Sequence, residues 1–159
     1  MTRNTHVPMF KRKRTGQTDY SKRKSMIVSR SVILSIRISN KHSIFQFIEP
    51  KIEGDSIKSS CHSSQITKLG WNGSGKSLYG LYLTGYLAGK KAKSAGLDKA
   101  ILYIGRREFG SGLKIIYALK GVIDAGIDIT ANNDIFPDSE KFKTDATQKI
   151  IEEINSKYG

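Results

Sequence analysis

The chain has 159 residues, enough for one globular domain with a sizeable core and one or two appendages. Its 27 lysines and arginines exceed its 14 aspartates and glutamates by 13, an excess that indicates a polyanionic partner. Its apolar runs are far shorter than the roughly 20 residues that span a bilayer, so we expect no membrane-spanning helix. The N-terminus lacks the apolar region typical of a secretory signal, so we expect no such signal there.

Positive charge is concentrated in the N-terminal segment. Residues 1–30 hold nine basic side chains against Asp19 alone, whereas residues 121–159 hold four basic and eight acidic ones. Residues 1–24 also lack hydrophobic periodicity, so we expect a basic arm that is flexible when free. The run KRKR at 11–14 resembles a nuclear-targeting signal or a solvated tail, but TGQTDY follows it directly and offers turn residues and the stacking face of Tyr20.

Three strands are expected next. VILSIRI (32–38) and SIFQFIE (43–49) alternate apolar and polar residues, and the short connection 39–42 predicts an antiparallel hairpin. SIKSSCH (56–62) is a weaker strand with small residues on one side.

A helix is expected over 77–95, where apolar and small residues recur every three or four positions, with Gly96 suited to its end. Tyr79, Tyr82 and Tyr86 on this helix fit either a ladder that stacks bases or, as we favour, the core and its rim. Gly85, Ala88, Gly89 and Ala92 would let the helix approach its neighbours closely.

The second half of the chain predicts a buried strand over 99–105, a loop with two arginines at 106–112 and an amphipathic helix over about 112–125. IDIT (127–130) suggests a last short strand. A helical tail follows residue 137, with a narrow stripe of Ile150, Ile151 and Ile154. This order predicts an α/β domain in which helices pack on a mixed sheet.

GWNGSGKS (70–77) matches the phosphate-loop pattern G-x-x-x-x-G-K-[ST], in which backbone amides and a lysine bind phosphates and a hydroxyl binds Mg²⁺. A true phosphate loop follows a buried strand, but the serine-rich SSCHSSQITKL precedes Gly70. The apolar strand AILYIG also ends in Gly105, where a magnesium-binding aspartate would be expected. We therefore favour a loop in which Trp71, Asn72 and Lys76 contact RNA over a nucleotide-hydrolysing site, which stays the competing hypothesis.

Other catalytic chemistry finds little support. A nuclease would need clustered carboxylates on neighbouring strands, and the first two strands offer only Glu49. Cys61 and His62 are adjacent on a strand and so point to opposite faces, which excludes a thiol–imidazole pair. A single cysteine allows no disulfide within the chain and fits a reducing compartment. The three histidines lack metal-ligand spacing, so we expect no metal and no cofactor.

Several stretches together resemble a known family. They are KRKRTGQTDYSKRK (11–24), RISNKHSIFQFIE (37–49), GWNGSGKSLYGLYLTGYLAGKKA (70–92), YALKGVIDAGIDI (117–129) and IFPD (135–138). They are similar to the universal large-subunit ribosomal protein that binds 5S ribosomal RNA, the eighteenth in the universal numbering, in its archaeal and eukaryotic form. The loop at 106–112 and the opening of the helix at Ser77-Leu78 depart from the family's usual pattern.

The resemblance implies a ribonuclease-H-like α/β fold without catalytic carboxylates, and no enzymatic activity. It also implies a structural role in the cytoplasmic ribosome, in which the chain anchors 5S rRNA in the central protuberance and contributes to subunit assembly and translation. The implied partners are 5S rRNA, large-subunit rRNA and neighbouring ribosomal proteins, with no membrane and no nucleotide.

The expected organisation is a basic RNA-binding arm (1–24), an α/β core (25–136) and a helical tail (137–159). The residues that the resemblance assigns to RNA lie in the arm, the hairpin and the Gly-Trp loop: Lys11, Arg12, Lys13, Arg14, Thr18, Tyr20, Lys22, Arg23, Lys24, Arg37, Asn40, Lys41, Trp71, Asn72 and Lys76.

Overall fold

A four-stranded mixed sheet forms the centre of the computed structural model, which describes residues 8–105, 113–132, 135–137 and 144–158. The strands are β1 (Ile33–Ile38), β2 (Ser43–Glu49), β3 (Ser56–His62) and β4 (Ile101–Tyr103), in the order β3-β2-β1-β4. The first three pair antiparallel, and β4 joins β1 in parallel. The expected hairpin and the expected mixed sheet are both confirmed.

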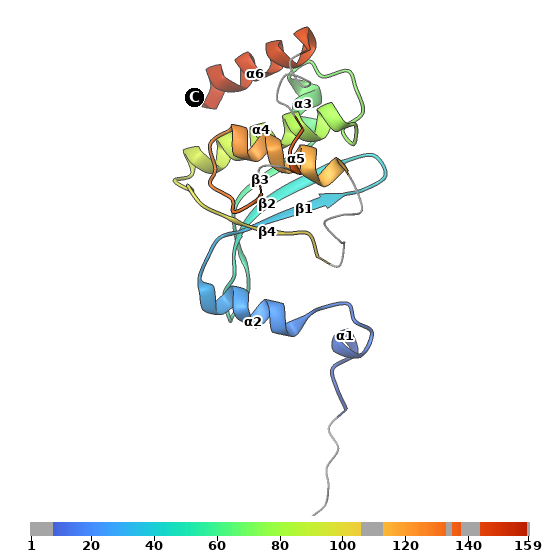
Figure 1. The fold of residues 1–159 in the computed structure, drawn as a ribbon, viewed down its shortest axis with the longest axis vertical. Helices are drawn as coiled ribbons and strands as arrows, with labels where there is room; N and C mark the ends of the chain where they lie inside the picture. The colour runs from blue at the N-terminus through green and yellow to red at the C-terminus, as the bar shows by residue number, and fades with distance from the viewer. Residues whose placement is uncertain (1–7, 106–112, 133–134, 138–143, 159) are drawn as a thin grey trace, which may run out of the picture.

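The strand register gives the sheet two different faces. Leu34 pairs with Phe47 and Ile36 with Phe45, and all four side chains are buried on one face. Because successive side chains of a strand alternate between faces, Ile33, Ser35, Arg37 and Ile48 lie on the other. We call this second face the arm-side face, because α1 (Lys11–Arg14) and α2 (Tyr20–Ser29) lie beyond it (Figure 1).

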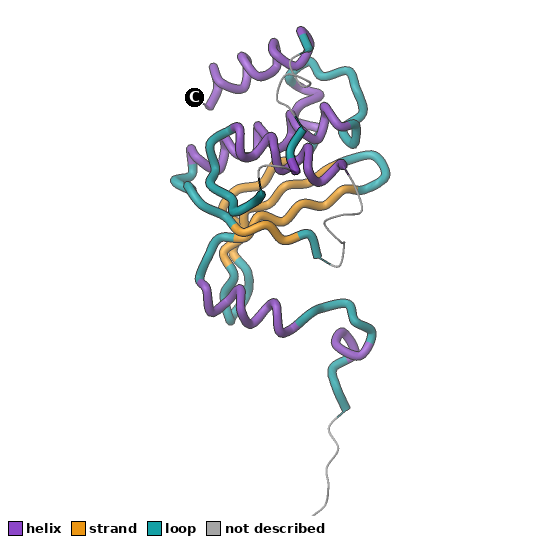
Figure 2. The backbone as a smooth tube through the Cα atoms, viewed as in Figure 1, coloured by secondary structure: helices purple, strands orange, loops and turns teal. Residues whose placement is uncertain are grey.

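The remaining helices lie on the opposite side of the sheet. α4 (Leu78–Ser94) and α5 (Leu113–Asp124) cover the sheet, and α6 (Asp145–Tyr158) packs on the outer side of α4 (Figures 1 and 2). The short α3 (Ser64–Lys68) connects β3 to the Gly-Trp loop. None of the helices in the described ranges is long and apolar enough to cross a lipid bilayer.

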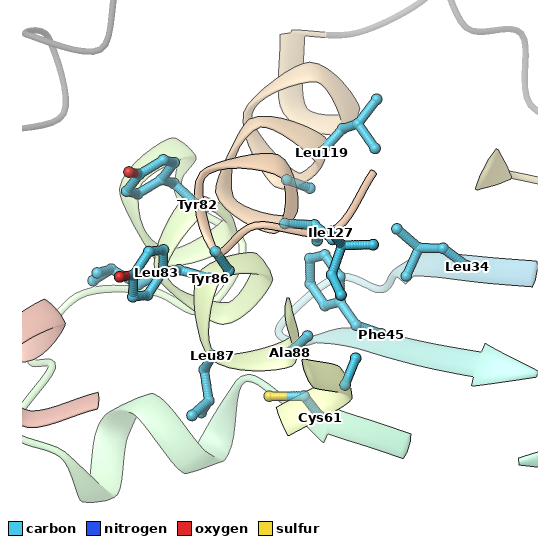
Figure 3. Close-up of a cluster of buried hydrophobic side chains, with 14 of the residues drawn as sticks. Leu34, Phe45, Cys61, Tyr82, Leu83, Tyr86, Leu87, Ala88, Leu119 and Ile127 are labelled. Carbon is cyan, nitrogen blue, oxygen red and sulfur yellow. The ribbon is translucent and has the colours of Figure 1, made fainter. Parts of the chain in front are cut away.

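The core lies between the sheet and the α4–α5 layer. Figure 3 shows Ile127 beside Phe45 of the sheet and Ala88 of α4 close to Cys61 of β3, whereas Tyr82 and Tyr86 lie on the side of α4 away from Phe45; all of these side chains are buried. Glycines allow this close packing, because a Cβ on Gly121 would overlap the backbone of Tyr82.

The helices expected over 77–95 and 112–125 are confirmed with small shifts at their ends, and the tail helix is confirmed over 145–158 with Ile150 and Ile154 buried. Two strand predictions need correction. β4 covers only 101–103 and its Ile101 is exposed, because β4 is an edge strand rather than a buried one. Residues 127–130 contribute a single bridge, Lys99 to Asp128, and no strand.

Two further predictions concern residues that the structure does not describe. The loop at 106–112 and residues 138–143 of the tail lie outside the described residues. α2 spans residues 20–29, so one helix crosses the expected boundary between arm and core at residue 24.

Candidate nucleic-acid interface

α1 consists of the four basic residues KRKR, and all four are exposed. The Thr15 hydroxyl and amide close the turn by donating to the carbonyl oxygen of Lys11, the hydroxyl at 2.9 Å. Successive residues of a helix point about 100° apart, so this one turn displays positive charge around its whole circumference. Such a segment can contact phosphates on more than one side.

The TDY sequence begins α2. The Asp19 carboxylate accepts hydrogen bonds from the amides of Ser21 (3.0 Å) and Lys22 (3.1 Å), which caps the first turn. Lys22 and Lys24 are exposed on this helix, and Tyr20 keeps 39% of its surface in solvent. Thr18 is half-buried beside the cap.

Arg23 is the one member of the predicted set for which a carboxylate partner is found in the described parts of the chain. Its Nη2 lies 2.9 Å from Asp55 Oδ1, and its Nη1 lies 3.1 Å from Oδ2. The guanidinium lowers the pKa of Asp55 chiefly by hydrogen bonding, and the carboxylate raises the pKa of Arg23. The pair joins α2 to the turn that precedes β3.

The β1–β2 hairpin and the Gly-Trp loop lie together at one end of the sheet. Ser43, just after the hairpin turn, donates from its hydroxyl to the carbonyl of Gly75 at 3.1 Å. Arg37, Asn40 and Lys41 of the hairpin are exposed. The structure therefore brings two of the three predicted contact regions side by side.

Within the Gly-Trp loop, Asn72 is exposed and Lys76 is partly buried. The Trp71 ring packs against the hydrophobic core, and a Cβ on Gly73 would overlap it. Much of the indole surface is therefore occupied within the protein. We infer a structural role for this ring.

The loop does not have the architecture of a phosphate loop. α3, not a buried strand, precedes Gly70. The Ser77 hydroxyl, which would bind Mg²⁺ in a phosphate loop, donates to the carbonyl of Ser74 (2.7 Å) and accepts from the amide of Gly80 (3.1 Å). It thus caps α4. Among the described residues, no group of three or more His, Cys, Asp or Glu side chains is arranged to hold a metal ion.

The tyrosines of α4 belong mainly to the core, as we favoured. Tyr82 and Tyr86 are buried, and their hydroxyls donate to Asp124 (3.0 Å) and Asn155 (2.8 Å), whereas Tyr79 is exposed at the rim. Asp124 also forms an ion pair with Lys120 at 2.8 Å.

The sequence analysis singled out neither Asp55, which pairs with Arg23, nor Tyr103. Tyr103 pairs with Ser35 in the parallel register, which puts its side chain on the arm-side face. Alternation along AILYIG predicts that Ile101 and Tyr103 lie on the same face of the sheet. It does not predict which face the helices cover.

Comparisons with known proteins agree with one another. A family model described as "Ribosomal large subunit proteins 60S L5, and 50S L18" matches residues 6–100. The chain is 41% identical over 145 residues to a protein of Korarchaeum cryptofilum named "Large ribosomal subunit protein uL18", a match that covers 91% of this chain and 74% of the relative. Proteins of the same name from Methanothermobacter thermautotrophicus (36% identity; 92% and 76% covered) and Thermoplasma volcanium (39%; 83% and 82%) are also similar.

Proposed function

The chain belongs to the family of ribosomal large subunit proteins 60S L5 and 50S L18, and on this basis we propose that it binds 5S rRNA and anchors it in the central protuberance of the large subunit. Membership makes it a structural, non-enzymatic protein of the large ribosomal subunit, with ribosomal RNA and neighbouring ribosomal proteins as partners. The identity of the RNA as 5S, the central protuberance and the cytoplasmic location belong to the proposal.

The exposed turn of α1 carries this proposal. Within the described residues, none of Lys11, Arg12, Lys13 and Arg14 has a carboxylate within ion-pair distance. Four unpaired cations in one turn repel one another, and a polyanion placed around them relieves that repulsion. RNA phosphates supply such charge.

The three contact regions would act in different ways. Arm cations neutralise phosphates and release counterions, which supplies affinity and a steep dependence on salt but does not read sequence. Recognition of the folded RNA then comes from its shape, through 2′-hydroxyl contacts and stacking on an exposed ring such as Tyr20. The hairpin and the Gly-Trp loop add contacts from the end of the sheet.

The test replaces Lys11, Arg12, Lys13 and Arg14 with alanine and measures binding to 5S rRNA by filter binding. We expect binding to be lost at about 150 mM salt, and the slope of log K against log [salt] to fall by roughly three where residual binding is measurable. The folded core, checked by thermal unfolding, should be unaffected.

A matched control removes the same charge elsewhere. Lys68, Lys93, Lys149 and Lys157 are exposed on α3, α4 and α6, on the far side of the sheet from the arm. Replacing these four with alanine should reduce affinity much less. Equal losses in the two variants would show that net charge, and not the arm, determines binding, and unchanged binding of the arm variant would contradict the proposal.

A further inference from the structure

A groove separates the arm from the sheet. It has a volume of about 640 Å³ and runs between the α1–α2 segment and the arm-side face. The arm contributes Arg12, Thr18 and Tyr20 to its lining, and the sheet contributes Arg37 and Tyr103. Figure 1 shows the two walls as separate layers, with α1 and α2 beyond the face that α4 and α5 leave uncovered.

The chemistry of the groove changes from its floor to its rim. Ile33 and Ile48, paired across β1 and β2, form an apolar floor together with the Tyr103 side chain. At the rim, Arg12 and Arg37 are exposed, and neither has a carboxylate within ion-pair distance among the described residues. An apolar, aromatic floor beneath unpaired arginines suits a ligand that has a flat ring and an anionic group.

Two tyrosines line the groove, one on each wall. Arg23 lines the groove, where Asp55 holds its guanidinium, and Tyr20 and Tyr103 line the same groove. One ring therefore comes from the arm and the other from the edge strand. The Arg23–Asp55 pair links α2 to the turn before β3 and so helps to hold the two walls in place.

We propose that this groove holds an unpaired nucleotide of the bound RNA, with its base on Tyr103 and its phosphate between Arg12 and Arg37. The inference rests on the proposed function, which supplies the RNA, and it adds a nucleotide site to it. A volume of about 640 Å³ lies within the roughly 300–1,000 Å³ of small-ligand sites and admits one extruded nucleotide but no duplex. Unpaired bases of RNA commonly stack on aromatic side chains, and arginine binds phosphate through two parallel hydrogen bonds.

The test compares Tyr103→Ala, Tyr103→Phe and Tyr79→Ala in filter binding with 5S rRNA. Loss of a stacking ring reduces affinity by about 5- to 150-fold, so we expect a loss in this range for Tyr103→Ala. Tyr103→Phe keeps the ring and should bind within about twofold of the wild type. Tyr79 is exposed on α4, and Tyr79→Ala should have no effect. The salt slope should be unchanged in all three variants, because no cation is removed.

Ultraviolet cross-linking of the wild-type complex provides a second measurement that needs no variant to fold. We expect the peptide that contains Tyr103 to be joined to one nucleotide that is unpaired in the RNA. Absence of this cross-link, or wild-type affinity in a folded Tyr103→Ala variant, would overturn the nucleotide site.

These outcomes separate the two proposals. If the α1 variant loses 5S rRNA binding while Tyr103→Ala keeps it, the groove proposal fails and the proposed function stands. If the wild type does not bind 5S rRNA, the proposed function fails. Cross-linking to the other large-subunit rRNA then decides the groove proposal: a Tyr103 cross-link supports it, and none overturns it.

Discussion

Arg23 and Asp55, 32 residues apart in the chain, form an ion pair through the two terminal guanidinium nitrogens and both carboxylate oxygens, at 2.9 and 3.1 Å. The first lies in the middle of α2 and the second in the turn before β3. The sequence analysis assigned Arg23 to RNA together with its basic neighbours. Its geometry also supports a role in orienting the arm, because the edge formed by its two terminal nitrogens is occupied by Asp55.

The Arg23–Asp55 pair leads us to predict that removing a negative charge weakens RNA binding. Asp55→Ala makes the protein one unit more positive, and electrostatics alone would predict tighter binding. We expect affinity for 5S rRNA to fall about two- to fivefold, because the arm loses a link worth roughly 0.5–1 kcal/mol at this exposure. Arg23→Ala should cause a similar loss, and the double variant should lose little more than either one. If Asp55→Ala binds more tightly than the wild type, Arg23 is a phosphate ligand and not an orienting residue.

The same pair should give a defined dependence of stability on pH. Arg23 lowers the pKa of Asp55, so the pair's contribution is complete above the ordinary aspartate range and is lost as pH falls through the lowered value. The difference in unfolding free energy between the wild type and Asp55→Asn should be constant from pH 7 to about 5 and shrink below about pH 4. Urea unfolding across this range measures it, and a difference that grows toward low pH would contradict the assignment.

The α4–α5 contact predicts an inverted effect of helix propensity. Glycine to alanine inside a helix usually stabilises it by up to about 1 kcal/mol. A Cβ on Gly121 would overlap the carbonyl of Tyr82, and one on Gly85 would overlap the carbonyl of Ala118. We therefore expect each alanine variant to be destabilised by about 1–3 kcal/mol in urea unfolding. Ser94→Ala, at the exposed end of α4, serves as control and should change stability by less than about 0.5 kcal/mol.

Sequence periodicity predicted the sheet and the two covering helices because these elements bury one face. Phe45 and Phe47 alternate with half-exposed residues along β2, and the buried Ile115, Leu119 and Val122 recur at helical spacing along α5. The same pattern failed for β4, where three residues on an edge carry too little alternation to show how far they are covered. Hydrophobic periodicity also did not reveal α2, which crosses the expected end of the arm at residue 24. This helix begins with a cap at Asp19 and has no apolar stripe.

The candidate site was harder to predict, because charge identifies surfaces but not their geometry. A run such as KRKR indicates an exposed cationic segment wherever it lies. Which cation is already paired depends on Asp55, 32 residues beyond Arg23, and no local pattern links the two. Trp71 shows the converse, because an aromatic residue in a glycine-rich loop suggests stacking while its ring packs largely against the core.

Ser77 tests the remaining enzymatic hypothesis. Its hydroxyl caps α4, so Ser77→Ala should lower stability by about 0.5–2 kcal/mol, and Ser77→Thr should keep most of the cap. We expect no saturable binding of ATP to the wild type at micromolar concentrations, and Lys76→Ala should change nothing in that titration. Saturable binding that Lys76→Ala abolishes would restore the phosphate-loop hypothesis.

Cys61 gives a chemical measure of how firmly the sheet and α4 stay together. The side chain is buried, its thiol donates to Gln65 Oε1 at 3.3 Å, and burial raises its pKa to about 12, against a smaller opposing effect of Lys91. The thiol should therefore stay protonated at pH 8 and react with a disulfide reagent only when the core opens.

The rate of this reaction should rise with urea in step with the unfolded fraction, and the unfolded chain should release one equivalent at once, since it has a single cysteine. The raised pKa also determines whether the protein gains or loses stability as pH rises. Below the unfolded thiol's ordinary value near 9, burial of the neutral thiol carries no penalty; above it, the unfolded chain gains stability by losing the proton. The wild type should thus lose stability relative to Cys61→Ala between about pH 9 and 11. Rapid complete reaction of the native protein at pH 8 would show instead that this part of the core opens readily.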